Sequence, residues 1–239
     1  DLAGAAAHIQ HSTDLFELGE HWAKMHSYIM LAYLKQAQGE FESSAELFLR
    51  ACAVEETIRI QRSNTSDRLR LTQLAILLSR VRPEMAYFLA DAYRRVENLG
   101  VHANDEVDFS SPAGYLRERM YTELACLLLA MDRAAEALPL LMRLLEAAVT
   151  MERQGDEIRY LVLIALAHHA LANSQTAMDF LGQALILAEP QGYIRLFVDE
   201  GQPMAELLRF AVSNNLSTDY ASRLLAAFPN HELSVVTID

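Results

Sequence analysis

Histidine side chains are the first candidates for chemistry here, and their spacing limits what they can do. His168 and His169 are adjacent, so on a helix they point about 100° apart and cannot bind one metal ion from the same face. His8 and His11 have a helical ligand spacing, but no set of cysteines or carboxylates completes a site with them. We therefore expect structural roles for these histidines and no metal site.

The other reactive residues give no catalytic pattern either. Cys52 and Cys126 lie far apart in apolar helical stretches and belong to no CxxC or Cys/His spacing, which predicts two buried, reduced thiols. Asp199 and Glu200 stand next to each other just before Gly201, as residues that end and solvate a helix do. The sequence has no nucleophile–base pair and no G-x-x-x-x-G-K-[ST] phosphate loop. We do not predict an enzyme.

The composition favours a helical, globular chain. Of its 239 residues 52% are hydrophobic, and nine glycines and six prolines leave little room for the turns of an all-β fold. The net charge is −12 without a basic cluster, which argues against direct contact with nucleic acid. The apolar runs are too short to span a membrane and no signal peptide is visible, so we expect a cytoplasmic protein.

Apolar residues recur with a helical period in most of the chain. In DRAAEALPLLMRLLEAA they follow one another at steps of four, three and four: Ala134, Leu138, Leu141 and Leu145. Ser111 before Pro112 is a typical helix N-cap, and Gly155 follows a helical run as a C′ residue would. Pro139 conflicts with this period and predicts either a kink or a helix that begins later.

The helical segments repeat a common layout. A first helix is followed by a short turn, a small residue, and further apolar or small residues four and seven places on. The small residues that we take as equivalent are Ser44, Ala86, Ala137 and Ala177. Small side chains where two helices cross, with larger ones where the next pair stacks, are typical of tetratricopeptide repeats. The alternative is an ordinary helical bundle with accidental periodicity.

The repeats predict two regions. Pro190 stands just past the second helix of the fourth hairpin, where a repeat should end, and Tyr193–Val198 begins a shorter helical element. We therefore expect an all-α superhelix of about four long tetratricopeptide-like hairpins over residues 1–190, with short capping helices in residues 191–239. Because the chain begins with Asp1 and ends VVTID, we also expect it to be a piece of a longer protein.

Two stretches resemble a known family. AEPQGYIRLFVDEGQPMAELLRFA and TELACLLLAMDRAAEALPLLMRLLEAA are similar to the helical-repeat region of MalT-like regulators, the large ATP-binding transcription regulators of the LuxR class. The resemblance covers residues 67–228 well and the first hairpin more weakly. It implies an ATP-binding switch and a helix-turn-helix domain in other parts of the protein, with no cofactor in this segment. It also implies that the segment senses an effector.

The predicted effector site is a groove lined by the first helix of each hairpin. Counting from the aligned small residues places six side chains there: Tyr33, Gln36, Arg119, Thr122, Arg159 and His169. This mixed polar lining suits a small polar effector or an extended peptide, and the best-known relative responds to an oligosaccharide. The same side chains could also be solvated helix faces.

The expected partners are a small-molecule effector, other domains of the same regulator, or a second copy of the chain. We expect no contact with a membrane. The rival function is a scaffold whose groove binds a partner's peptide or helix without any small molecule.

Overall fold

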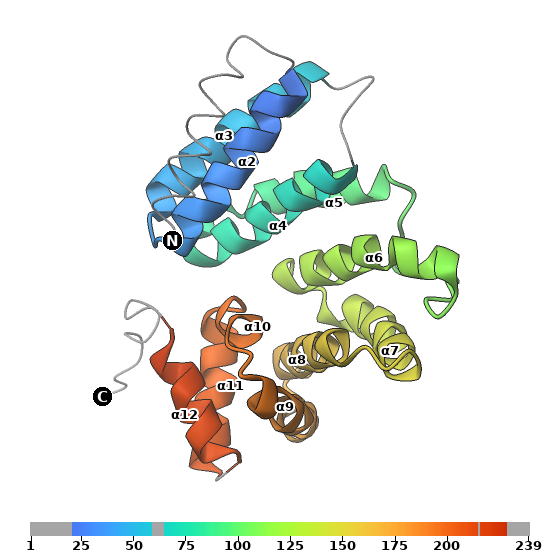
Figure 1. Ribbon diagram of the computed structural model, residues 1–239, viewed down its shortest axis with the longest axis vertical. Helices are drawn as coiled ribbons and strands as arrows, with labels where there is room; N and C mark the ends of the chain where they lie inside the picture. The colour runs from blue at the N-terminus through green and yellow to red at the C-terminus, as the bar shows by residue number, and fades with distance from the viewer. Residues whose placement is uncertain (1–20, 59–64, 215, 229–239) are drawn as a thin grey trace. The chain divides into compact units, whose positions relative to one another are not determined.

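The computed structural model describes residues 21–58, 65–214 and 216–228, and every regular element in these ranges is a helix (Figure 1). The predicted all-α class of tetratricopeptide-like repeats is confirmed. The chain divides into two compact units, residues 1–101 and 102–239, which are described separately below. His8 and His11 lie outside the described residues.

The first unit contains two helical hairpins in which consecutive helices pack together. Its elements are α2 (His21–Ala37), α3 (Phe41–Ile58), α4 (Thr65–Val81), a 3-10 turn (Pro83–Met85) and α5 (Phe88–Glu97).

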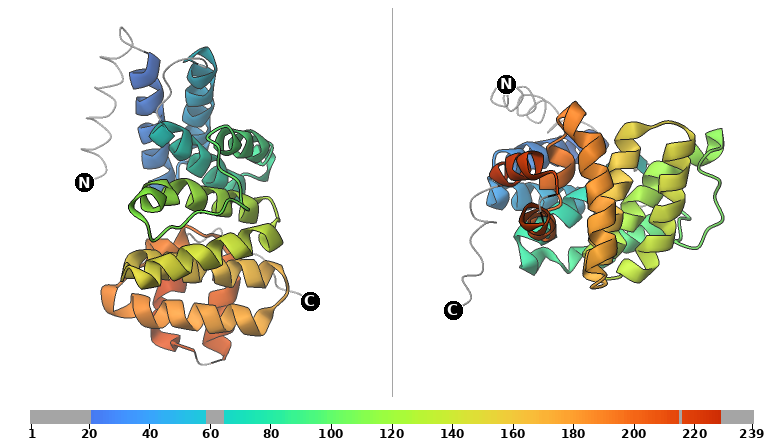
Figure 2. Two further views of the ribbon diagram at one scale, coloured as in Figure 1. Left: turned by 90° about the vertical axis from the view of Figure 1, so that its right-hand side faces the viewer. Right: turned by 90° about the horizontal axis from the view of Figure 1, so that it is seen from below.

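The second unit contains two further hairpins and three shorter helices. Its elements are α6 (Pro112–Ala130), α7 (Ala134–Thr150), α8 (Gln154–Ala170), α9 (Ser174–Ala188), a 3-10 turn (Glu189–Gln191), α10 (Arg195–Val198), α11 (Gln202–Ser213) and α12 (Thr218–Ala226). Figure 2 shows α6 to α9 stacked in chain order. Helices α10 and α11 pack against α8, and α11 also contacts α9. Three short helices therefore follow the fourth hairpin, as predicted, while the boundary at residue 190 stays a prediction.

Small residues mark the close crossing within three of the four hairpins. Ser44, Ala137 and Ala177 are each the fourth residue of the second helix, and all three are fully buried. The residue twelve positions earlier, on the first helix, is a buried alanine in each case. In the first hairpin the Ser44 hydroxyl donates to the Ala32 carbonyl at 2.9 Å, which shows how closely the two helices approach.

The predicted register of the second hairpin is wrong by one residue. Ala86 is exposed and precedes α5, whereas the side chains buried at the same spacing are Met85, Leu89 and Ala92. The 3-10 turn delays the start of α5 to Phe88, so a count through continuous helix places the wrong face inward. Both registers contain small or apolar residues, so the sequence pattern fits either.

The turns between α6 and α9 share one backbone geometry. Asp132, Glu152 and Ala172 each adopt a left-handed conformation, with φ between 54° and 59°. The next residue donates its N–H to the carbonyl five positions earlier in every case, at 2.8–2.9 Å, as in a Schellman motif. Gly155 is not part of such a turn: it is the second residue of α8, so the predicted C′ role is wrong. Three short turns of one kind make consecutive helices antiparallel neighbours.

Helices α6 and α7 bear on two further predictions. Ser111 is the N-cap of α6, and its hydroxyl accepts a 3.1 Å hydrogen bond from the Gly114 N–H, as predicted. Helix α7 begins at Ala134 and runs through Pro139, so the predicted late start is wrong. A proline within a helix removes one backbone donor, and buried residues of α7 stand on both sides of Pro139 in the sequence.

The acidic loop before α6, residues 102–111, makes polar contacts with helices α6 and α7. The Tyr121 hydroxyl donates to an Asp105 carboxylate oxygen at 2.7 Å, and the Arg143 guanidinium donates to the backbone carbonyls of Ala103 and Asp105. Phe109 is buried edge-on against Tyr121, with ring centroids 5.1 Å apart. The Tyr121 hydrogen bond lowers the pKa of the Asp105 carboxyl. Burial, followed by that same hydrogen bond, raises the pKa of Tyr121 to about 12.

This hydrogen bond makes the second unit sensitive to acid. Because the folded pKa of Asp105 lies below the unfolded value of about 3.9, its stabilisation is present above that pH and is lost as pH falls through the folded pKa. We expect Tyr121→Phe to cost about 1 kcal/mol at pH 7, which is less than the roughly 1.5–3 kcal/mol typical of a charged acceptor because Asp105 is partly exposed. The difference from wild type should shrink below about pH 4. Thermal unfolding of both proteins at pH 7 and pH 3 measures this, and an equal difference at both pH values would contradict it.

Candidate functional site

The structure distributes the six predicted ligand residues over both units. Tyr33 and Gln36 lie on α2 of the first unit, while Arg119 and Thr122 lie on α6 and Arg159 and His169 on α8 of the second. All six belong to the first helix of a hairpin, as the sequence count assumed. Their surroundings differ, and we describe them in turn.

Tyr33 and Gln36 lie toward the C-terminal end of α2. The Tyr33 hydroxyl donates to the Arg70 carbonyl at 2.9 Å and is equally close to Oε1 of Gln73, so it joins α2 to α4. Oε1 of Gln36 is buried and has no hydrogen-bond partner among the described residues. Tyr33 therefore holds two first helices together, and Gln36 leaves one acceptor unused.

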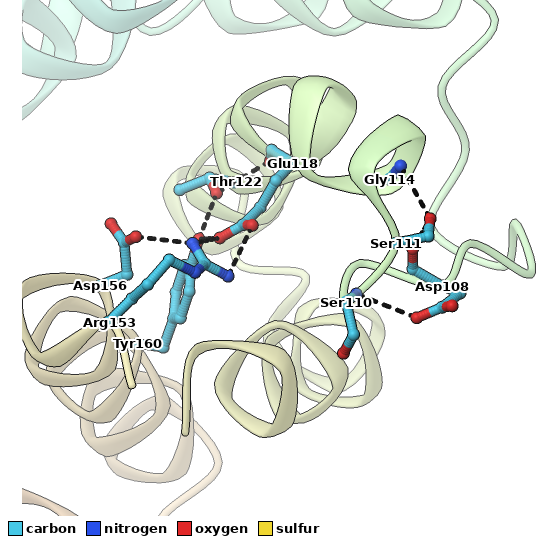
Figure 3. Close-up of polar contacts among 9 residues, drawn as sticks. All are labelled: Asp108, Ser110, Ser111, Gly114, Glu118, Thr122, Arg153, Asp156 and Tyr160. Carbon is cyan, nitrogen blue, oxygen red and sulfur yellow. Dashed lines mark hydrogen bonds and ion pairs between the residues drawn. The ribbon is translucent and has the colours of Figure 1, made fainter. Parts of the chain in front are cut away.

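Thr122 belongs to a buried polar cluster between α6 and α8, which we call the Glu118 cluster: Glu118, Thr122, Arg153, Asp156 and Tyr160 (Figure 3). The Glu118 carboxylate accepts a 2.5 Å hydrogen bond from the Tyr160 hydroxyl and is 2.8 Å from two guanidinium nitrogens of Arg153. The Thr122 hydroxyl donates to the Glu118 carbonyl and is 3.0 Å from the Tyr160 hydroxyl. Thr122 thus contacts Tyr160 of α8 and the backbone of its own helix rather than solvent.

Ion pairs dominate the Glu118 cluster, although Oε2 of Glu118 and Nε and Nη2 of Arg153 are buried without a hydrogen bond among the described residues. Arg153 also contacts the Asp156 carboxylate at 2.6 Å, so one guanidinium faces two carboxylates. Burial, together with the hydrogen bond to Glu118, raises the pKa of Tyr160 above its ordinary value, and the phenol stays neutral. The cluster is suited to fixing α6 against the N-terminal end of α8. The sequence analysis missed Glu118, Arg153 and Tyr160, although the two glutamates of α6 were a visible signal.

Glu123, the second glutamate of α6, does not belong to the Glu118 cluster. It is buried, and its carboxylate is 3.8 Å from a guanidinium nitrogen of Arg159, which is 37% exposed. Burial alone would lower the Arg159 pKa, but Cys126, Glu123 and Glu200 raise it above its ordinary value. The guanidinium therefore stays charged.

Arg119 lies one helical turn before Glu123 on α6. Its side chain is exposed and has no ion-pair or hydrogen-bond partner within the described ranges. We call Arg119, Glu123 and Arg159 the arginine face. It combines one unpaired cation with a second cation held by a long ion pair.

His169 lies at the opposite end of α8 from Arg159. Its Nε2 is 3.6 Å from a Glu206 carboxylate oxygen on α11, so this pair connects the fourth hairpin to the helices that follow. The neighbouring His168 ring stacks on Phe180, with centroids 5.6 Å apart and ring planes at 8°. The two histidines point to different partners, as their adjacency on a helix predicts.

A cleft of about 550 Å³ lies between α9 and α11. None of the six predicted residues lines it, and the sequence analysis did not foresee it. Its walls carry the large apolar side chains Ile186 and Phe210, both exposed.

No reactive or metal-binding group stands out in the part of the chain that the structure describes. No cluster of three or more His, Cys, Asp or Glu side chains there could hold a metal ion. Burial raises the pKa of Cys52 to about 12, so this thiol stays protonated, and Cys126 is buried and not part of a disulfide. No helix within the described ranges has the length and apolar character that crossing a membrane requires.

The hairpins, their buried small residues and their shared turns define a protein of tetratricopeptide-like helical repeats. The family model of the MalT-like TPR region matches residues 1–214, and the chain belongs to this family. No curated protein matches the sequence.

Proposed function

We propose that the chain is the effector-sensing and protein-interaction module of a MalT-like, LuxR-class transcription regulator, and that it has no catalytic role. The observation that carries this proposal is the family match over residues 1–214. As part of such a regulator, the module works in the cytoplasm. ATP binds to a different domain of the regulator.

The arginine face is our proposed contact surface for the effector. Arg119 is exposed with no carboxylate to neutralise it, and the 3.8 Å separation of Arg159 from Glu123 leaves that guanidinium able to take a better hydrogen-bonding partner. A small polar molecule with hydroxyl or carboxylate groups fits these two donors. His169 offers a further polar contact near Glu206.

The proposed mechanism is a population shift. An effector that binds one arrangement of the module more tightly than another displaces the equilibrium toward it, and only by the ratio of the two affinities. The favoured arrangement releases the ATP-binding domain and permits self-association, which presents several DNA-binding domains together.

A thermal-shift screen tests the proposal. The chain is melted with oligosaccharides, amino acids and aromatic acids, because a ligand that binds only the folded state at 100 times its Kd adds about 2.7 kcal/mol of stability. We expect one class to raise the melting temperature, and Arg119→Ala or Arg159→Ala to abolish the rise. Arg50→Ala is the matched control, since it removes an exposed arginine from α3 and should leave the shift intact. If no compound shifts the melt at millimolar concentration, the scaffold function replaces the sensor.

A further inference from the structure

The cleft between α9 and α11 is built from two helices and the turn that follows α11. It is lined by Gln175, Met178, Asp179, Gly182, Gln183, Ile186, Phe210, Asn214 and Leu216. Leu216 lies over Gly182, where an added Cβ would already be 3.4 Å from the leucine side chain. The missing side chain at Gly182 thus lets Leu216 pack onto α9 and close one part of the cleft.

Two large apolar side chains of the cleft are exposed. Ile186 on α9 is 64% exposed and Phe210 on α11 is 48% exposed, and both line the same cavity. Single exposed apolar residues are ordinary, but large ones that converge on a concave surface mark interaction sites. The unburied faces of Ile186 and Phe210 are therefore what a binding partner would cover.

The polar lining restricts the chemistry of that partner. The polar side chains are three amides and the Asp179 carboxylate, and no cation is among the lining residues that the structure describes. Asp179 is exposed, and its carboxylate accepts a 3.0 Å hydrogen bond from the neutral Gln175 amide, which does not neutralise its charge. The chain as a whole carries −12, which attracts a cationic partner over a longer range.

The backbone of both walls excludes an extended strand. The backbone N–H and C=O groups of α9 and α11 are hydrogen-bonded within the helices. The cleft therefore offers no sheet edge to which an extended peptide could add a strand. A helix needs no such edge, because its apolar side chains at i, i+3, i+4 and i+7 enter the cleft while its own backbone stays internally bonded.

We propose that the α9–α11 cleft is a docking site for a cationic amphipathic helix of another protein, whose apolar face packs between Ile186 and Phe210 and whose Lys or Arg side chains contact Asp179. This site is separate from the arginine face of the proposed effector function. Either one can therefore fail without the other.

The test uses the full chain and a fluorescein-labelled synthetic peptide of leucine and lysine, with leucines at i, i+3, i+4 and i+7, followed by fluorescence anisotropy. We expect saturable binding that weakens at least tenfold for Phe210→Ser or Ile186→Ser, and about threefold for Asp179→Asn. A scrambled peptide of the same composition should bind at least tenfold more weakly. The same should hold for a peptide with glutamate in place of lysine.

Met142→Ser is the matched control, because Met142 on α7 is 43% exposed and lies outside the cleft. It should bind like the wild type, and circular dichroism should show that every variant remains helical. Equal binding by the scrambled peptide overturns the proposal, and so does unchanged binding by Phe210→Ser. Concentration-dependent dimerisation that Phe210→Ser abolishes also overturns it, because the occupant would then be a second copy of the chain.

Discussion

Glu118→Ala is expected to lower the free energy of unfolding of α6 and α8 by about 3–5 kcal/mol, because it leaves a buried guanidinium without its main carboxylate partner. In the wild type the Glu118 and Arg153 side chains are 5% and 16% exposed and meet at 2.8 Å. The Tyr160 hydroxyl loses its 2.5 Å acceptor at the same time and keeps only its contact with Thr122.

Native-state hydrogen exchange measures this effect unit by unit, which suits a chain that divides into two compact parts. The slowest amides of α6 and α8 should exchange faster in Glu118→Ala, while those of α2 and α3 should not change. The control is Arg133→Ala, which breaks the Arg133–Glu136 pair on the surface and should cost far less than Glu118→Ala. Equal losses in the two variants would show that the Glu118 cluster does not hold α6 to α8.

A double variant separates the charge pair from the packing. Replacing both Glu118 and Arg153 by leucine removes the two buried charges together, and such replacements are often close to neutral. We therefore expect the double variant to recover most of the stability that Glu118→Ala loses. A loss as large as that of the single variant would mean that the charges themselves stabilise the fold.

The repeat architecture could be predicted because it rests on local patterns. Ser44, Ala137 and Ala177 keep one position in their helices, and each has a buried alanine twelve residues earlier. The start of α6 could be predicted for the same reason, because a serine followed by a proline is a typical N-cap sequence. The Ala86 register failed because a 3-10 turn changes the residue count before α5, and no local residue pattern revealed that turn.

The contacts of the candidate site depend on how neighbouring helices pack, and a local sequence pattern does not determine that packing. Arg119 and Thr122 are three residues apart on α6, yet one is exposed and the other is buried against Tyr160. Which side is covered depends on where α8 lies, and that follows from the left-handed turn at Glu152. A glutamate at φ 54° has no sequence signature comparable to a glycine at the same position.

The same limit applies to the two glutamates of α6. Glu118 meets Arg153 in a buried cluster, whereas Glu123 meets Arg159 at a partly open surface. Residue type and helical spacing are alike in the two cases. Only the packing of α8 distinguishes the pair that is buried on both sides from the pair whose arginine stays partly exposed.

Gly114→Ala is expected to destabilise the second unit by about 3 kcal/mol, because the new methyl group has no room. A Cβ at this position would lie 1.9 Å from the Asp108 carbonyl oxygen and 2.9 Å from the Phe109 Cα, and both are backbone atoms that cannot rotate away. Relief requires the acidic loop to move off α6. That movement also disturbs the Ser111 cap, whose hydroxyl bridges the Gly114 N–H and the Asp108 carbonyl (Figure 3).

Gly155→Ala is the matched substitution with the opposite expected sign. Gly155 is also near the start of a long helix, but a Cβ there meets only the Tyr193 hydroxyl at 3.5 Å, an ordinary contact. Alanine should raise stability by up to about 1 kcal/mol, since glycine is the poorer helix former. Thermal unfolding of the two variants and the wild type measures whether each substitution lowers or raises the stability. A Gly114→Ala melt as high as that of Gly155→Ala would mean that the loop does not rest against α6 in solution.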